Sequence, residues 1–294
     1  MTVPRRLLAL LAVGGVLAGC GGSAPKGPPG LLLVSTKDGD YAIFGAAANG
    51  KHVRRLTKEK GDATTNAGLF FQVEPAWSPD GRSIAFASLR GGTSHVYVMD
   101  ADGTGTRRLT SSNQDDNHPS WSADGKRIVF AREGALFVVP VTGGAARRVG
   151  RGLGSAADPA WSPDGRWIAY DYRNPGSSVR ELYLMRADGT AIRRLTKLGQ
   201  VSALPAWSGD GKRIAFQSNA ALGHFEAYTI GADGTGLRQV THSVVDVIQP
   251  SWTPDGRLGF SRDGQIWVDD HGTEKKLTSG TNDSNPVWRP VVPE

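Results

Sequence analysis

Polar side chains recur at one position of an eight-residue motif that the chain repeats. The motif PAWSPDGR occupies residues 75–82 and returns unchanged at residues 159–166, and three close copies and a truncated PVWRP also occur. The residue before the motif's proline is Glu74, His118, Asp158, Leu204, Gln249 or Asn285. Carboxylates, an imidazole and amides could together bind a basic or polar segment through charge-assisted hydrogen bonds. Paired carboxylates could also act as acid and base if burial raised one pKa.

Other catalytic and metal-binding patterns are missing or incomplete in this sequence. There is no G-x-S-x-G elbow of a serine hydrolase. DADGTG, from Asp100, begins like a calcium loop but lacks the acidic residue at the twelfth position and falls at an expected hairpin turn. The six histidines stand at different positions in their repeats, and no phosphate-binding or dinucleotide-binding loop is present. We therefore predict no catalytic residue, no metal and no cofactor.

The spacing of the repeat indicates which elements position these side chains. The motif tryptophans lie 36–46 residues apart, a period typical of repeat folds, at Trp77, Trp121, Trp161, Trp207, Trp252 and Trp288. Each unit continues with apolar runs such as IAF and VYVMD, an ADG-like hairpin turn, and a run such as TRRLT. Each unit therefore predicts four short antiparallel strands, in which the proline begins the first strand and SPDG turns into the second.

These letters resemble the WD40-like PD40 repeats of TolB-type propellers over residues 31–294. The N-terminal runs from LLLVSTKDG to HVRRLT supply second, third and fourth strands, and the C-terminal NPVWRP supplies a first strand. Joined together, these two parts complete one unit. The resemblance and the repeat count predict an all-β, six-bladed β-propeller closed by a C-terminal first strand that completes the N-terminal blade.

The N-terminus predicts export from the cytoplasm. Arg5 and Arg6 precede a thirteen-residue apolar run, too short to span a membrane, which is typical of a signal peptide at residues 1–19. LAGC resembles the bacterial lipobox and implies lipidation of Cys20, the single cysteine of the chain. An ordinary signal peptide with an incidental cysteine is the alternative. Residues 20–30, rich in glycine and proline, predict a tether, so the expected location is extracytoplasmic and lipid-anchored to the bacterial membrane.

The direction of the chain separates the connections of a propeller onto two faces. Turns between strands one and two and between strands three and four are nearly uniform, whereas second-to-third-strand loops and blade links vary. Variable loops on a rigid scaffold carry function, and in TolB-type propellers the channel mouth on this face receives a partner protein. The resemblance implies the same surface here. The predicted partner-binding residues, expected at a water-filled rim, are Glu74, Asp116, His118, Asp158, Asp246, Gln249, Asp283 and Asn285.

Two further features leave alternatives open. The link at residues 58–74 is longer than the other links, and its Leu69, Phe70 and Phe71 could form an apolar contact over the mouth or extend the first strand of their blade. Arginine and lysine pairs on the fourth strands could bind a polyanion. Charges on an outermost strand also prevent edge-to-edge aggregation, which is the interpretation that we favour.

The leading functional hypothesis is a lipid-anchored, non-enzymatic propeller that binds an envelope protein or peptide through the channel mouth. We expect a monomer that contacts the membrane only through its lipid anchor and has no nucleic-acid partner. A glycan-active lyase or hydrolase, a carbohydrate-binding or cell-wall-binding module, and a water-filled funnel without a ligand remain open. TolB carries an α/β domain before its propeller, whereas only a short tether precedes residue 31 here, so the role of TolB in the Tol–Pal system is not implied.

Overall fold

The computed structural model describes residues 27–38, 41–57, 74–89, 92–150, 155–221, 223–280 and 282–291. The predictions on the signal peptide, on Cys20 and on residues 58–73 of the long link lie outside the described residues. Every regular element in the described ranges is a β-strand, and no helix there has the length and hydropathy of a membrane span. The predicted all-β class is confirmed.

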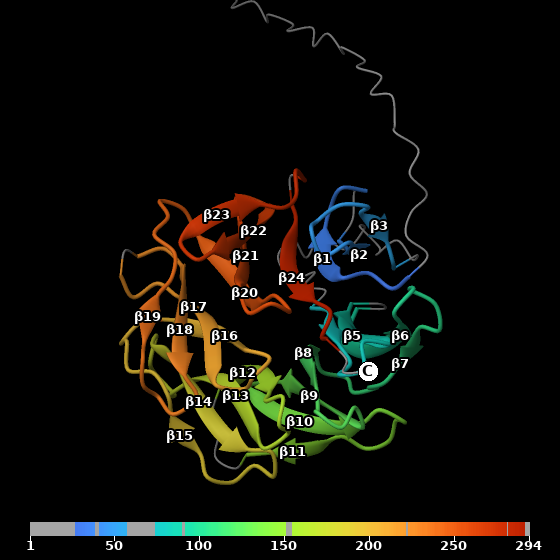
Figure 1. Ribbon diagram of the computed structural model, residues 1–294. Coiled ribbons are helices and arrows are strands. Elements are labelled where there is room, and N and C mark those ends of the chain that lie inside the picture. The colour runs from blue at the N-terminus through green and yellow to red at the C-terminus, as the bar shows by residue number, and fades with distance from the viewer. Residues whose placement is uncertain are drawn as a thin grey trace, which may run out of the picture.

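Six four-stranded antiparallel sheets, the blades, are arranged in a ring (Figure 1). Blade 1 contains β24 (Ser284–Trp288), β1 (Leu31–Ser35), β2 (Ala42–Ala46) and β3 (Arg54–Arg55). Blade 2 contains β4 (Ala76–Trp77), β5 (Ser83–Ser88), β6 (His95–Asp100) and β7 (Arg107–Arg108). Blade 3 contains β8 (Asp116–Trp121), β9 (Arg127–Arg132), β10 (Ala135–Pro140) and β11 (Arg147–Val149).

The other three blades follow the same order from the channel outward. Blade 4 contains β12 (Ser155–Trp161), β13 (Trp167–Arg173), β14 (Arg180–Arg186) and β15 (Arg193–Arg194). Blade 5 contains β16 (Ser202–Trp207), β17 (Arg213–Ser218), β18 (Glu226–Gly231) and β19 (Arg238–Gln239). Blade 6 contains β20 (Val247–Trp252), β21 (Leu258–Arg262), β22 (Gln265–Asp270) and β23 (Thr273–Lys276).

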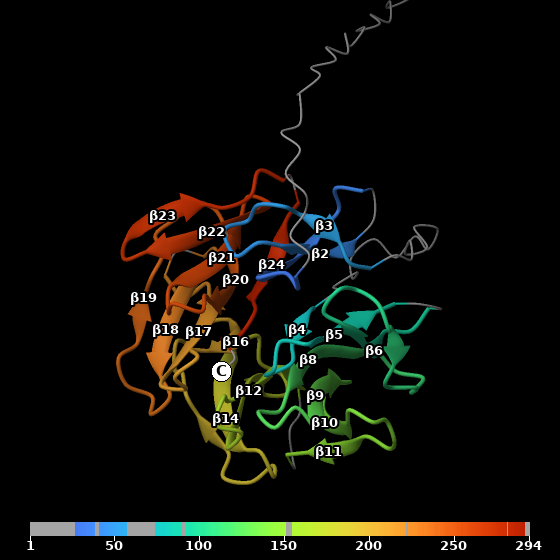
Figure 2. The ribbon, with the colours of Figure 1, turned by 45° about the vertical axis from the view of Figure 1, so that its right-hand side comes forward.

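Blade 1 is assembled from segments far apart in the sequence. β24 pairs antiparallel with β1, so that Leu31 faces Trp288 and Leu32 faces Val287. On its other side, β24 packs against β20 and β21 of blade 6 (Figure 1 and Figure 2). The predicted closure, in which a C-terminal first strand completes the N-terminal blade, is therefore confirmed.

The repeated SPDG turn specifies local geometry. Ser78 Oγ donates to Asp80 Oδ1 at 2.6 Å, and the backbone N–H of Gly81 donates to the Ser78 carbonyl at 2.8 Å. Gly81 has a φ of +63°, a left-handed conformation that glycine adopts without a Cβ clash. The same bond from serine or threonine to aspartate recurs in blades 3, 4, 5 and 6. The recurrence of these residues therefore has a structural explanation.

The tryptophans of the motif join neighbouring blades. Nε1 of Trp121 donates to the Ala76 carbonyl of blade 2 at 3.1 Å, and equivalent bonds form in blades 5 and 6. Trp161 differs, because its Nε1 donates to Gly165 within its own turn. The Trp121 ring packs in an apolar cluster with Leu109 and other side chains of blades 2 and 3. The core therefore lies between blades, where each fully buried large apolar side chain contributes about 1.5–3 kcal/mol.

The arginine pairs of the outer strands contact the next blade. Arg107 Nη2 donates to the Val141 carbonyl at 2.6 Å, and Arg54 Nη1 donates to the Asp102 carbonyl at 3.2 Å. Arg193 makes the equivalent contact with blade 5. Each acceptor lies in the turn between the third and fourth strands of the following blade. These contacts give three of the pairs a structural role at the outer edge of the ring.

Candidate functional site

The residues before the motif prolines lie at β-bulges in the innermost strands. Register shifts interrupt the first strands of blades 3, 4, 5 and 6. The bulged residues have left-handed backbones, with φ values of 54° at His118, 50° at Asp158, 55° at Leu204, 55° at Gln249 and 50° at Asn285. Residues other than glycine rarely adopt this conformation, although asparagine, aspartate and histidine adopt it more often than most. In five blades, therefore, the innermost strand contains one residue with a strained backbone next to the channel.

Side chains of the preceding blade satisfy several of these bulged backbone groups. The Glu74 carboxylate accepts the N–H of His118. Gln249 Oε1 accepts the backbone N–H of Asn285 at 2.8 Å. The backbone N–H of Gln249 in turn donates to Gln217 Oε1 at 3.0 Å. A buried N–H left without a partner would be destabilising, so these contacts stabilise the bulge as well as the blade interface.

His118 lies between two carboxylates that come from the blades on either side of it. Its Nε2 is 2.6 Å from Glu74 Oε1 and 2.9 Å from Asp158 Oδ1. Burial opposes the charged imidazolium, but Asp158 and Glu74 outweigh it and raise the pKa of His118 well above its usual value. Burial is the main cause that raises the pKa of Glu74, although His118 opposes it. The three side chains therefore form an ionic bridge across blades 2, 3 and 4.

The bridge continues into the sheet of blade 4. Asp171, fully buried on β13, forms an ion pair with Arg180 at the start of β14 and lies near enough to Asp158 to affect its pKa. Burial and the nearby Asp158 raise the pKa of Asp171 well above its usual value, although Arg180 opposes them. Burial opposes the ionised form of Asp158, but its contact with His118 outweighs burial and lowers the pKa of Asp158. The bridge therefore extends to Arg180, which supplies the cation beside Asp171.

The structure divides the predicted partner-binding residues into three groups. Glu74, His118 and Asp158 meet on one side of the channel, and Gln249 contacts Asn285 on another. The remaining residues are Asp116, which contacts its own blade, and Asp246 and Asp283, which contact the preceding blade.

The three remaining aspartates each have a local role. Asp116 forms a bidentate ion pair with Arg132 at 2.6 and 3.0 Å. Asp246 Oδ1 accepts the N–H of Phe225 at 2.7 Å. The backbone N–H of Asp283 donates to the Gly264 carbonyl.

The expectation of a water-filled rim is wrong for several of these side chains. Relative exposure is 7% at Glu74, 0% at Asp116 and 5% at Asp283. The physical reason is that partners inside the protein compensate these carboxylates, as the N–H of His118 does for Glu74 and Arg132 does for Asp116. Contacts inside the protein therefore largely compensate these charges. The role of these residues in partner binding stays a prediction.

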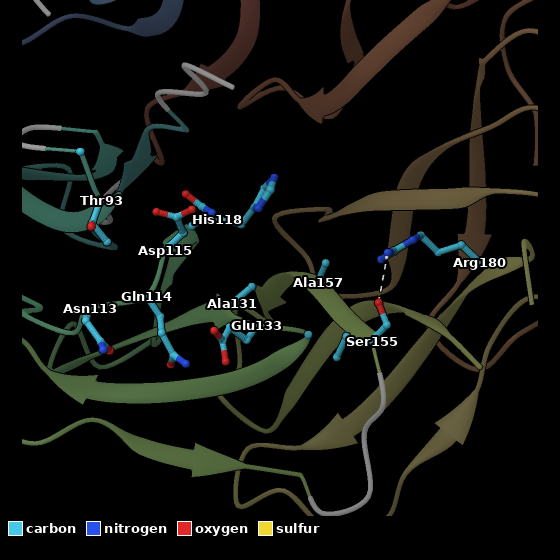
Figure 3. A pocket seen from close by; sticks show the side chains of 14 residues that line it. Thr93, Asn113, Gln114, Asp115, His118, Ala131, Glu133, Ser155, Ala157 and Arg180 are labelled. Atoms are coloured by element: carbon cyan, nitrogen blue, oxygen red, sulfur yellow. Dashed lines mark hydrogen bonds between the residues drawn. The ribbon is translucent and has the colours of Figure 1, made fainter. Parts of the chain in front are cut away.

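A polar cavity of about 610 Å³ lies beside the bridge, between blades 2, 3 and 4. Its lining comes from the β5–β6 loop, the link before β8, the β9–β10 turn, and the starts of β12 and β14. We call the side of the ring that carries these connections the loop face. Figure 3 shows Asp115, Gln114 and Glu133 in one part of the cavity, and Arg180 with Ser155 in another.

Sequence reasoning missed Asp171, Arg180 and Glu133. Asp171 and Arg180 stand in the apolar strand runs IAYDYR and RELYLM, and a charge in a strand expected to be buried on both faces was the available signal. Glu133 begins a two-residue turn in which it has a φ of 46° and Gly134 a φ of 71°. A turn of this type fixes the position of its side chains, but sequence does not show that it borders a cavity.

Metal binding has no support in the part of the chain that the structure describes. No group of three or more histidine, cysteine, aspartate or glutamate side chains there is arranged to hold a metal ion. In the Glu74–His118–Asp158 bridge, the oxygens contact Nε2 directly at hydrogen-bond distances, so the bridge itself occupies the space between its ligand atoms.

Comparison with known proteins places this geometry in a family. The family model described as PD40, TolB beta propeller domain, matches residues 22–139 and 132–292. The chain is 26% identical to an uncharacterized peptidase, YuxL, of Bacillus subtilis (strain 168), over 52% of this chain and 32% of the relative. It is 29% identical to a TolB homolog of Chlorobium chlorochromatii (strain CaD3), over 48% of this chain and 30% of the relative.

A solved structure of TolB from Acinetobacter baumannii has the same fold, with a TM-score of 0.73 and 18% sequence identity. The superposition covers 89% of this chain and 66% of that chain. The matches span about a third of the length of the two curated relatives. Because the family model covers nearly all of the described propeller, the chain belongs to the PD40 family, the TolB beta propeller domain.

Proposed function

We propose that the protein is a binding module of the bacterial envelope that holds a segment of a partner protein or peptide at the channel mouth. The observation that carries the proposal is the cavity of about 610 Å³ on the loop face, next to the His118 bridge. Cavities of this size accommodate small ligands or one to a few side chains of a partner. The similarity to TolB homologs supports the part of this proposal that the partner is a protein.

The proposed location is extracytoplasmic, with a lipid anchor at Cys20. The support comes from the predicted signal peptide at residues 1–19 and from the resemblance of LAGC to the lipobox. The tether at residues 20–30 would leave the loop face free to meet a partner at some distance from the membrane. In this arrangement the module works as a monomer, and the lipid makes its membrane contact.

The His118 bridge supports binding over catalysis. A general base needs a free lone pair, but Nε2 of His118 lies at hydrogen-bond distance from two carboxylates, which raise its pKa well above the usual value and favour the protonated imidazole. Glu74 and Asp158 are held by the same imidazole, so neither carboxylate is free to take a proton from a substrate. A lyase or hydrolase at this point would have to break the bridge first. The bridge instead gives the cavity a rigid wall that joins three blades.

Photo-crosslinking in an envelope extract tests the proposal. A photoreactive amino acid at Thr93, which lines the cavity, is compared with the same amino acid at Thr190, an exposed turn residue on the opposite face. We expect a discrete crosslinked product from position 93 and none from position 190. Equal products from both positions, or products from position 190 alone, would contradict binding at the channel mouth.

A further inference from the structure

Two carboxylates in the cavity carry charge that the described residues do not neutralise. Asp115 and Glu133 line the cavity, both are exposed, and neither forms an ion pair within the described ranges. The cationic residues of the lining are already engaged, since His118 lies between two carboxylates and Arg180 pairs with Asp171. Among the described lining residues, the uncompensated charges are therefore negative, although the chain as a whole is positively charged.

The backbone holds the Asp115 carboxylate in place and sets where the Glu133 side chain begins. The N–H of Ser94 donates to Asp115 Oδ1 at 2.7 Å, which ties the link before β8 to the β5–β6 loop and leaves Oδ2 for a ligand. Glu133 stands in the two-residue β9–β10 turn with a left-handed φ of 46°, followed by Gly134. A carboxylate fixed by a hydrogen bond, as Asp115 is, needs less reordering when a ligand binds, which improves affinity.

The rest of the lining suits a polar, hydrogen-bonding ligand. Asn113 and Gln114 offer amide oxygens, and Ala131 and Ala157 add only small side chains to the lining. Among the described lining residues, His118 has the only aromatic ring, and its imidazole is held between two carboxylates, so these residues offer no stacking surface for a sugar. Carboxylate and amide oxygens together match the donors of a guanidinium or an ammonium group.

We infer that this cavity receives a basic side chain, arginine or lysine, of the partner segment, with Asp115 and Glu133 as its counter-charges. The inference rests on the proposed function and adds the chemical class of the residue that the partner inserts. It also assigns the attraction to two carboxylates other than the compensated ones at the bulges. A guanidinium bound by both side chains displaces the water that hydrates them. Because the attraction is electrostatic, the affinity falls as the salt concentration rises.

An amide NMR titration with a designed peptide tests this inference. The probe is acetyl-Gly-Gly-Arg-Gly-Gly-amide, and the reference peptide carries citrulline, the neutral isostere, in place of arginine. We expect the arginine peptide to shift the amide signals of Thr93 and Gly134 and to bind about tenfold more tightly than the citrulline peptide. Equal affinities for the two peptides, or no binding of the arginine peptide, would overturn the inference.

Variants localise the effect, and the repeat supplies a matched control. Asp263 occupies the equivalent turn in blade 6, with a φ of 50° against 46° at Glu133. The pair of changes Asp115→Asn and Glu133→Gln should weaken binding of the arginine peptide about tenfold or more, whereas Asp263→Asn leaves it unchanged. An equal effect of Asp263→Asn would show a response to overall charge and would overturn the assignment to this cavity.

The crosslinking assay separates this inference from the proposed function. The photoreactive residue at Thr93 is placed in the Asp115→Asn, Glu133→Gln background, with melting temperature as the check on folding. We expect the yield of crosslinked partner to fall about tenfold. An unchanged yield would leave binding at the mouth intact while excluding the basic side chain. Absence of a product from the unaltered cavity would instead remove the proposed function itself.

Discussion

Replacing His118 with asparagine tests the ionic bridge between three blades. Asn285 occupies the equivalent position in blade 1 with a φ of 50°, against 54° at His118, so the backbone conformation is preserved. The substitution leaves the Glu74 carboxylate, 7% exposed, and the Asp158 carboxylate, 13% exposed, without the imidazolium between them. The measured effect therefore reports the loss of the cation.

The magnitude follows from the burial of the bridge. Removing one partner of a buried ion pair costs about 3–5 kcal/mol. The His118 side chain is 23% exposed, so water partly screens the two carboxylates and we expect a loss at the lower end, about 3 kcal/mol. In a domain of this size, that loss lowers the melting temperature by about 6–12 °C.

The effect depends on pH in a defined direction. The pKa of His118 is raised above 6.5, so its contribution is complete below pH 6.5 and is lost as pH rises through the folded-state pKa. The pKa of Asp158 is lowered from 3.8, so its contribution is present above pH 3.8 and is lost as pH falls through the lowered value. Because the pKa of Glu74 is raised, its charge is fullest toward the upper end of this window. The loss caused by the substitution is therefore greatest near pH 6.5.

The assay is thermal and urea unfolding of the protein at about pH 6.5 and about pH 9. His271→Asn is the matched control, because His271 also has a left-handed φ, 54°, but is exposed and forms no ion pair within the described ranges. A melting temperature for His118→Asn within about 2 °C of this control at about pH 6.5 would refute the bridge. A loss that grows toward alkaline pH would refute the assigned charge of His118.

Three further results are expected. Ending the chain after residue 283 removes β24 and exposes the edge of β1, so unfolding should lose cooperativity or the protein should aggregate; an unchanged melting curve would contradict the six-blade closure. Gly259→Ala places a Cβ 2.0 Å from the Trp288 ring, so urea unfolding should show a loss of about 1–3 kcal/mol, whereas Gly209→Ala, whose Cβ meets nothing within 4 Å, should be nearly neutral; equal stabilities would disprove the close packing of β24. Cys20→Ser should release the protein from membranes or block its processing, measured by fractionation and lipid labelling; wild-type protein that is soluble with a free thiol would exclude lipidation.

The sequence alone determined the architecture, because the determinants of a blade are local. The serine, aspartate and glycine of each SPDG-type turn act within four residues, as Ser78, Asp80 and Gly81 show. Tryptophan spacing set the number of blades, and the unmatched strand runs at the two ends predicted that β24 would complete blade 1. Because the same local pattern occurs in several repeats, a departure from the pattern in one repeat does not prevent prediction of the fold.

The chemistry of the mouth was decided by tertiary structure. Sequence placed Glu74, His118 and Asp158 at equivalent positions, but it did not show that all three side chains would meet in one bridge. Nor did it show that Arg132 would neutralise Asp116. Whether a charged side chain is compensated within the protein or can bind a partner depends on its nearest neighbours in space. Since the two carboxylates come from other blades, 44 and 40 residues from His118 in sequence, only the closed ring determines which charges are left for a partner.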